Sequence, residues 1–260
     1  MTPSTHRLLT DRVTLGYGDR TVVREVSVAI PDGKVTVVVG PNACGKSTLL
    51  KGLARLMRPH GGSVLLDGEE IHRRPTKEVA KVLGLLPQNP IAPDGVAVAD
   101  LVGRGRHPHQ GVFTRWSTED RAAVQEAMVL TDTYALADRA DDELSGGQRQ
   151  RVWIAMALAQ ETPLLLLDEP ITFLDIAHQV EIMDLCAKLH VEGRTLVAVL
   201  HDLNHACRYA THLIAMRDGS IVAEGPPSEI VDAALVERVF GLKCLVVPCP
   251  ASGAPMVVPA

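Results

Sequence analysis

A glycine-rich loop between a predicted strand and a predicted helix constrains this chain more than any other feature. Val35–Val39 is a run of β-branched residues, which is typical of a parallel strand covered on both faces. Residues 40–47, GPNACGKS, follow at once, and residues 49–57, LLKGLARLM, then place leucines at helical spacing. Because strand, loop and helix stand in the order that a phosphate-binding loop requires, a chance match to the loop pattern is a poor explanation.

Apolar segments elsewhere in the chain extend this unit into an α/β core. Val26, Val28 and Ile30 alternate with small residues, which predicts a half-buried strand in an N-terminal antiparallel β part. A helix is predicted over residues 177–189, and the turn Asp218-Gly219 predicts a hairpin. Strands of a mainly parallel sheet are predicted at 164–167, 195–200 and 213–216.

The middle of the chain has a different character from the core. Ser117 precedes two acidic residues and an alanine-rich stretch, which predicts the start of a helix. The predicted fold class is therefore α/β, with a P-loop NTPase core and a helical insertion. Within a single domain, 1–260, we assign 1–87 and 161–225 to the α/β catalytic core, 88–160 to a helical subdomain with the segment at 144–148, and 226–260 to a C-terminal tail. Residues 245–260 of this tail are expected to form short edge strands or coil.

Composition argues against several classes of partner and location. With 260 residues, 46% of them hydrophobic, the chain can bury a sizeable core, and its formal charge of -5 argues against nucleic acid as a partner. Aromatic residues make up 3%, too few for stacking platforms. The start MTPSTHRLL lacks a signal-peptide pattern, and no apolar run approaches the roughly 18 residues of a membrane-spanning helix. Five cysteines without a CxxC pair indicate the cytosol and no structural zinc.

The loop chemistry predicts ATP and Mg²⁺ as ligands. Gly40 and Gly45 stand where backbone amides must close on phosphate oxygens, because a Cβ would collide there, and the following helix N-terminus favours an anion. Lys46 would reach the β- and γ-phosphates, and Ser47 would offer its hydroxyl to Mg²⁺. The residues expected to contact ATP are Gly40, Pro41, Asn42, Ala43, Cys44, Gly45, Lys46, Ser47 and Thr48.

Two acidic residues follow the predicted strand at 164–167. Asp168 can hold Mg²⁺ through a water molecule, and Glu169 is placed to act as general base for an attacking water. Phosphoryl transfer needs little beyond positioning and charge neutralisation, which this pair supplies. A strand that ends in Asp-Glu is on its own most often a solvated strand end, so this prediction depends on the phosphate loop.

A third candidate site is the segment Leu144-Ser145-Gly146-Gly147-Gln148, which precedes another predicted helix. One interpretation is a loop in which Ser145 caps the helix. A hydroxyl, two glycines that expose amides and a helix N-terminus also make a second phosphate-binding surface. Two such surfaces in one chain suggest that two chains clamp nucleotide between them.

In chain order, GPNACGKST, LSGGQRQR, LLLLDEP and VLHDLN resemble the nucleotide-binding subunits of ATP-binding cassette (ABC) transporters. The resemblance covers essentially the whole chain, and LSGGQ is among its most specific motifs. It implies the ABC ATPase fold and ATP hydrolysis coupled to transmembrane transport. It also implies that the signature, Leu144, Ser145, Gly146, Gly147 and Gln148, contacts ATP bound to a second copy.

The resemblance implies roles for four further residues. Tyr17 matches the aromatic residue that stacks on adenine, and Gln88 matches the glutamine that links Mg²⁺ and the attacking water to the transport domain. Asp175 matches the aspartate of the loop that crosses the dimer interface, and His201 matches the histidine that contacts the γ-phosphate. Simpler interpretations are that Tyr17 packs beside a turn, Gln88 is an ordinary loop residue and His201 is a capped core histidine.

Three stretches resemble more narrowly the ATPases of ferric-siderophore importers, a group that includes haem and vitamin B12 importers: LVGRGRHPH at 101–109, TFLDIAHQ at 172–179, and HDLN. The implied partners are two integral-membrane permease subunits, a second copy of the chain and an extracytoplasmic substrate-binding protein that acts through the permease. The implied location is the cytoplasmic face of the cell membrane, with part of the surface at 88–130 against the permease. Ile171 departs from the small hydroxyl residue common at its position.

Two other functional classes are compatible with a phosphate loop. A non-transport ABC ATPase of DNA repair or translation would carry a long coiled-coil insertion or two fused cassettes, and the sequence has neither. A P-loop kinase or GTPase would leave LSGGQ unexplained. The chelate cannot be named from this sequence, because specificity lies in the permease and the binding protein.

Cys44 lies within the phosphate loop. It fits there as a small tolerated side chain, but a helix N-terminus and the neighbouring Lys46 favour a thiolate. The hypothesis is that Cys44 is sensitive to alkylation and that ATP protects it.

Overall fold

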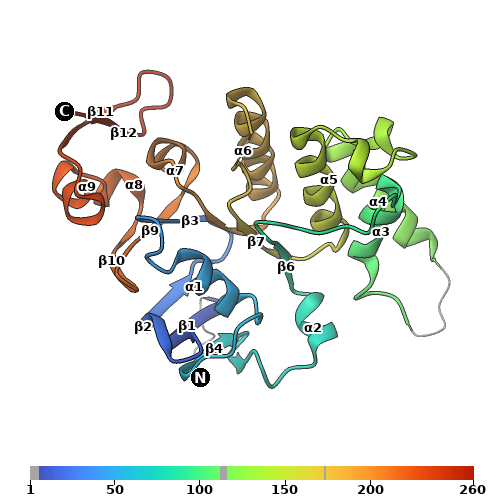
Figure 1. Ribbon diagram of the computed structural model, residues 1–260, viewed down its shortest axis with the longest axis horizontal. Coiled ribbons are helices and arrows are strands. Elements are labelled where there is room, and N and C mark those ends of the chain that lie inside the picture. The colour runs from blue at the N-terminus through green and yellow to red at the C-terminus, as the bar shows by residue number, and fades with distance from the viewer. Residues whose placement is uncertain (1–5, 112–115, 173) are drawn as a thin grey trace. The chain divides into compact units, whose positions relative to one another are not determined.

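The computed structural model describes residues 6–111, 116–172 and 174–260, which form two compact units (Figure 1). Residues 1–74 together with 193–260 are called the phosphate-loop unit, and residues 75–192 are called the helical unit. The start of the N-terminal stretch, part of the 88–130 surface and Phe173 of the Thr-Phe-Leu-Asp segment lie outside the described residues.

The phosphate-loop unit begins with an antiparallel sheet of strand order β2-β1-β4-β5. β1 (Leu8–Tyr17) pairs with β2 (Arg20–Ile30) and β4 (Gly61–Leu66), and the short β5 (Glu69–Glu70) pairs with β4. In β2 the predicted alternation is present, with buried valines on either side of exposed Ser27. The expected N-terminal antiparallel β part is confirmed.

The same unit contains four further strands, and the phosphate loop follows the first of them. β3 (Val35–Val39) is parallel to both of its neighbours, β8 (Thr195–Val199) and β9 (His212–Arg217), and every residue of β3 and β8 is buried. β10 (Ser220–Gly225) pairs antiparallel with β9 through the predicted Asp218-Gly219 turn, in which both residues have positive φ. The β-branched runs therefore form the parallel strands that the sequence predicts.

Helix α1 (Lys46–Leu53) differs from its sequence-based prediction at both ends. It begins inside the phosphate loop, where the amide of Leu49 already donates to the Gly45 carbonyl oxygen. It ends before the predicted Met57, because Arg55 adopts a left-handed conformation with φ of 63°. The helix N-terminus is thus part of the loop rather than an element that follows it.

The C-terminal tail forms a two-stranded hairpin that is anchored to a helix of the same unit. The side-chain amide of Asn204 donates to the Val257 carbonyl oxygen at 3.2 Å, and its oxygen accepts the Val257 amide at 2.7 Å. This pair of bonds fixes the second hairpin strand beside the helix that carries Asn204. The elements are α7 (Leu203–Tyr209), α8 (Pro227–Ile230), α9 (Ala233–Phe240), β11 (Cys244–Pro248) and β12 (Pro255–Pro259).

The helical unit combines two parallel strands with several helices. Ser117 and Ser145 each begin a helix with a capping box, in which the serine and the third residue of the helix satisfy each other's backbone amides. Its elements are α2 (Thr76–Ala80), β6 (Leu83–Leu86), α3 (Val98–Gly103), η1 (Arg104–Arg106), α4 (Thr118–Leu130), η2 (Tyr134–Leu136), η3 (Asp141–Glu143), α5 (Gly146–Ala159), β7 (Leu164–Asp168) and α6 (Ile176–Val191).

A buried ion network joins three segments of the helical unit. Arg106 is 4% exposed, and its Nε donates to a carboxylate oxygen of Asp120 at 2.9 Å. Its Nη1 donates to the Ala159 carbonyl oxygen at 2.8 Å and contacts Glu161. Because a buried guanidinium requires all of these partners, the network fixes the chain after α3 to the first turn of α4 and the end of α5.

The observed division into units differs from the predicted subdomain boundaries. β6 and β7 pair with each other and β6 packs on α5, so residues 75–87 and 161–192 cluster with the helices rather than with the phosphate-loop strands. Over the described residues, no helix is both long enough and apolar enough to cross a membrane.

Candidate functional site

The phosphate loop is shaped by its backbone. Gly40 has a φ of 153°, and a Cβ there would lie 2.2 Å from the Met216 carbonyl oxygen, so only glycine fits beside β9. Lys46 is 5% exposed, and its ammonium donates to the carbonyl oxygens of Gly40 and Pro41, both at 2.9 Å. Among the described side chains, none caps the first turn of α1. The loop therefore presents a buried cation and the amide end of a helix, which suits a phosphate group.

Cys44 lies on the buried side of this loop. It is 5% exposed, and a Cβ on Gly40 would lie 2.8 Å from its Sγ, so the thiol fills the space behind the loop. Burial raises the pKa of the Cys44 thiol, and this effect outweighs the opposing effect of Lys46. Burial therefore favours the interpretation of Cys44 as a small tolerated side chain, and the alkylation hypothesis stays a prediction. The sequence shows the neighbouring cation but not the desolvation.

Tyr17 ends β1 on the same unit. Its side chain is 52% exposed, and Lys51 of α1 lies with its Nζ 3.4 Å from the hydroxyl and 5.9 Å from the ring centroid. The ring therefore lies near α1 with much of its surface open to solvent. This placement is compatible with stacking on a base, and the adenine role of Tyr17 stays a prediction.

His201 follows β8, and the phosphate loop follows β3. These two strands are parallel, with Val38 opposite Val199, so their carboxyl ends lie at one edge of the sheet. Directly after His201, Asp202 begins α7 by accepting the amide of His205 at 2.7 Å. The fold thus brings the predicted histidine to the edge where the phosphate loop begins.

Glu169 and Gln88 lie at the ends of the paired strands β7 and β6. Gln88 donates its side-chain amide to Glu169 Oε2 at 2.6 Å. Glu169 is 9% exposed and has a φ of 55°, a conformation that non-glycine residues rarely adopt and that clusters at functional sites. Asp168, the last residue of β7, is 4% exposed. The structure therefore places Gln88, predicted from the resemblance, against Glu169 of the predicted Asp168-Glu169 pair, although the two contacting residues are 81 positions apart in the sequence.

Two further side chains hold this acidic turn, and the sequence interpretation did not identify them. The Thr172 hydroxyl donates to Glu169 Oε2 at 3.2 Å, so this oxygen accepts from both Gln88 and Thr172. Gln150 of α5 donates to the Pro170 carbonyl oxygen at 2.8 Å. The sequence signal that could have identified Thr172 is its position, since it places a hydroxyl group three residues after Glu169.

The signature segment begins α5. Leu144 is buried and anchors it, Ser145 Oγ accepts the amide of Gln148, and Gln148 Oε1 accepts the amide of Ser145. A Cβ on Gly146 would meet nothing within 4 Å. The interpretation of Ser145 as an N-cap is confirmed, and it coexists with an exposed glycine at the helix N-terminus.

Asp175 begins α6 and is paired with His178. Asp175 Oδ1 accepts the backbone amide of His178 at 2.9 Å and its Nδ1 at 2.7 Å. These bonds, the backbone one first, hold the pKa of the Asp175 carboxyl below its usual value. Asp175 is therefore an ionised, exposed residue whose direction is set by the following helix.

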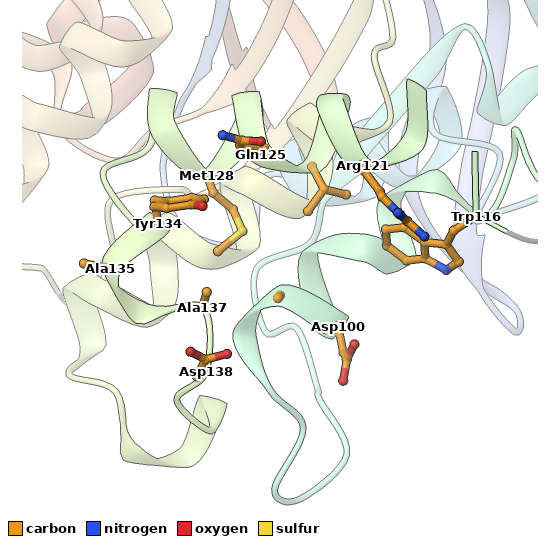
Figure 2. Close-up of a pocket in the computed structure, with 11 residues that line it drawn as sticks. Asp100, Trp116, Arg121, Gln125, Met128, Tyr134, Ala135, Ala137 and Asp138 are labelled. Carbon is orange, nitrogen blue, oxygen red and sulfur yellow. The ribbon is translucent and has the colours of Figure 1, made fainter. Parts of the chain in front are cut away.

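The helical unit also carries a surface groove of about 760 Å³ (Figure 2). Two exposed aromatic residues, Trp116 and Tyr134, lie at its opposite ends in this view, and Met128 lies between them. The Trp116 ring packs directly on Gly103 of α3, where a Cβ would lie 2.4 Å from the ring. Apolar side chains with charged neighbours, Asp100, Arg121 and Asp138, make this groove suited to a helical or extended peptide.

Comparisons with known proteins identify the family. The profile described as ABC transporter matches residues 23–172. The ferric enterobactin transport ATP-binding protein FepC of Escherichia coli (strain K12) is 56% identical over 260 residues, which cover 100% of this chain and 96% of that protein. The iron(3+)-hydroxamate import ATP-binding protein FhuC of Bacillus subtilis (strain 168) is 48% identical over 250 residues, covering 96% and 93%.

A solved structure agrees with these relatives. A dimeric ATP-binding cassette in a post-hydrolysis state, bound to ADP and Pi, matches with a TM-score of 0.74 and 28% identity, covering 84% of this chain and 98% of that one. The profile match spans more than half of the chain, and the first relative spans all of it. The chain therefore belongs to the ABC transporter family, as one of its ATP-binding and ATP-hydrolysing subunits.

Proposed function

We propose that this chain is the ATPase that powers import of a ferric siderophore across a cell membrane. The observation that carries the proposal is full-length identity of 56% to a ferric enterobactin transport ATP-binding protein, with 48% identity to an iron(3+)-hydroxamate import ATP-binding protein. The proposed assembly has two copies of the chain at the cytoplasmic face, two permease subunits and an extracytoplasmic substrate-binding protein. Haem or vitamin B12 import, and a non-transport ATPase, are the alternatives.

ATP is proposed to lie between residues 40–48 of one copy and residues 145–148 of the other. The support is chemical, because each segment contains glycines and leads into the N-terminus of a helix, α1 or α5. A dimeric cassette bound to ADP and Pi among the structural matches is a precedent for a dimer of cassettes that binds nucleotide. Asp175, beside the signature, would face the second copy as well.

The residues predicted to hold Mg²⁺ fit this ion by their chemistry. Ser47, Gln88 and Asp168 offer a hydroxyl, an amide oxygen and a carboxylate, which are the hard oxygen donors that Mg²⁺ prefers, with Asp168 acting through a water. The Gln88 amide nitrogen already donates to Glu169, so its oxygen remains oriented as an acceptor. When bound, Mg²⁺ would neutralise part of the negative charge of the phosphate groups.

The chain's own residues then perform the remaining steps. Lys46 and His201 bind the γ-phosphate, and Glu169 accepts a proton from the attacking water as general base. Gln88 and Thr172 fix the orientation of the Glu169 carboxylate through Oε2. Closure of two copies completes the site, and hydrolysis with product release reopens it.

Glu169→Gln tests the catalytic part of this proposal. The variant removes the base but keeps the shape of the side chain, so ATP should still bind while turnover falls about 100-fold or more. The measurement pairs release of phosphate with binding of a fluorescent ATP analogue. Hydrolysis by Glu169→Gln at the wild-type rate would show that Glu169 is not the general base.

The groove on the helical unit is the surface that we assign to the permease. An amphipathic helix from a cytoplasmic permease loop could place apolar residues on Met128 and Tyr134 and opposite charges near Arg121 and Asp138. In the reconstituted complex, Tyr134→Asp should reduce copurification with the permease while the isolated chain keeps its ATPase activity. Copurification at the wild-type level would show that the permease does not bind at this groove.

Transport itself separates the candidate substrates. Cells that lack this chain should lose uptake of a radioactive ferric siderophore and recover it when the chain is restored, but not when Glu169→Gln replaces it. Uptake of haem or vitamin B12 that depends on the chain in the same way would favour the alternative importers. Undiminished uptake of all three substrates would favour a non-transport ATPase.

A further inference from the structure

His178 of α6 contacts two motifs of the helical unit at once. Its Nδ1 donates to Asp175 Oδ1 at 2.7 Å, because an ionised carboxylate can only accept. Its ring also lies against the signature: a Cβ on Gly147 would be 2.8 Å from the ring Cδ2 and 3.1 Å from both Cγ and Nε2. One imidazole therefore connects the start of α6 to the start of α5.

The two signature glycines have different surroundings. A side chain on Gly146 would extend into open space, whereas one on Gly147 would collide with the His178 ring. Gly146 therefore faces outward, where a ligand can approach, and Gly147 is backed by His178. The ring is 35% exposed and Asp175 is 66% exposed, so the whole arrangement lies at the surface of the helical unit.

We propose that His178 is a positioning residue that holds Asp175 and the signature together as one surface for the second copy. The inference rests on the proposed composite site, in which both motifs of one copy face the ATP and the loop of the other. The ring sets the separation of the two motifs through Gly147, and Nδ1 sets the direction of the Asp175 carboxylate. A contact made by ATP at the signature thereby constrains Asp175 of the same copy.

Two substitutions separate the two contacts. His178→Asn places an amide donor where Nδ1 stands but removes the part of the ring that covers Gly147. His178→Phe keeps a ring against Gly147 but cannot donate to Asp175. His178→Ala removes both contacts. The full-length chain with Glu169→Gln is the common background, since ATP then persists and dimerisation can be measured at equilibrium.

The expected result is a loss of ATP-driven dimerisation with unchanged nucleotide binding by the monomer. The dimer dissociation constant, measured by sedimentation with ATP, should rise about 3- to 10-fold for His178→Asn and for His178→Phe, and more for His178→Ala. Binding of a fluorescent ATP analogue to dilute monomer should not change, which a general loss of structure would not allow. Dimerisation equal to the background in both single-contact variants would overturn the inference.

A double-mutant cycle gives an independent check. His178→Ala should recover part of the dimerisation lost in Gly147→Ala, about 3-fold or more, because it removes the collision. It should recover nothing in Gly146→Ala. Equal recovery at both glycines, or none at Gly147, would contradict the proposed contact. If the Glu169→Gln background fails to dimerise with ATP at all, the composite site fails, and that outcome is distinct from failure of His178 alone.

Discussion

The two units hold their site residues in different ways. In the phosphate-loop unit, the backbone and one buried ammonium shape the site, and a Cβ on Gly40 would collide with β9. In the helical unit, hydrogen bonds from side chains do the positioning, as from Gln88 and Thr172 to Glu169, or from His178 to Asp175. The comparison shows that the backbone determines the shape of the predicted phosphate site, whereas hydrogen-bonded side chains determine the positions of the predicted site residues in the helical unit.

The largest effect should follow from loss of the buried ammonium. Lys46→Ala removes the charge and both bonds that hold the loop closed, so affinity for ATP should fall about 100-fold or more. Titration with a fluorescent ATP analogue measures this. Lys34→Ala, an exposed lysine of the same unit, is the control and should bind normally. Near-normal affinity of Lys46→Ala would mean that the backbone alone forms the receptor.

The next largest effect concerns the stability of the helical unit, in which Arg106 is as buried as Lys46 is in the phosphate loop. Arg106→Ala leaves the Asp120 carboxylate buried without its cation and should lower the free energy of unfolding by about 3–5 kcal/mol at neutral pH. Urea unfolding measures this, with exposed Arg104→Ala as the control. A decrease in the free energy of unfolding no larger than that of Arg104→Ala would show that the Arg106 network does not stabilise this unit.

Because Asp120 is titratable, the destabilisation expected for Arg106→Ala should depend on pH. Burial alone would raise the pKa of Asp120, but hydrogen bonds from Arg106 and Ser117 hold it below its usual value. A lowered folded-state pKa stabilises the wild type above about pH 4, and this contribution is lost as the pH falls through the folded-state value. In Arg106→Ala the buried carboxyl is easier to protonate, so the difference between the two proteins should shrink on acidification.

A smaller effect is expected at Thr172. Thr172→Val removes one of the two donors to Glu169 Oε2 without changing the shape, so kcat should fall about 3- to 10-fold while ATP affinity stays the same. Thr172→Ser keeps the hydroxyl and should retain most of the activity. A kcat for Thr172→Val equal to that of wild type would mean that the Thr172 hydroxyl does not orient the base.

The smallest effect compares two cysteines of the phosphate-loop unit. Burial raises the pKa of Cys44, whereas hydrogen bonds from Ser252 lower the pKa of the more exposed Cys249. Maleimide should therefore react with Cys249 first at pH 7, and Cys249→Ser should remove the fast phase. A fast reaction at Cys44 that ATP suppresses would show that the phosphate loop opens in solution, which would weaken the contrast between the units.

The features that the sequence predicted are those that depend on short, continuous segments of the chain. Strand runs such as Val35–Val39, the phosphate loop and the caps at Ser117 and Ser145 depend on neighbours within a few residues, so local rules identify them. The strand β6 and its pairing with β7 were not predicted, and it is this pairing that places Gln88 beside Glu169.

Other contacts depend on how segments pack, and no local pattern encodes them. Gln150 and Pro170 meet only because α5 packs beside the end of β7, and Arg106 meets Glu161 across a gap of 55 residues. The early end of α1 depends on a left-handed Arg55, a residue that favours helices. The raised pKa of Cys44 has a related origin, since desolvation is a property of the folded loop.

The geometry around Lys46 has a consequence for what can replace it. An ammonium has three N–H bonds arranged as a tripod, and two of them point to the Gly40 and Pro41 carbonyl oxygens. The third direction is the one through which the cation can meet a phosphate oxygen. A flat guanidinium keeps the charge but cannot point to three partners in this arrangement, so arginine, although it is the conventional conservative exchange, would preserve the electrostatics and lose the site.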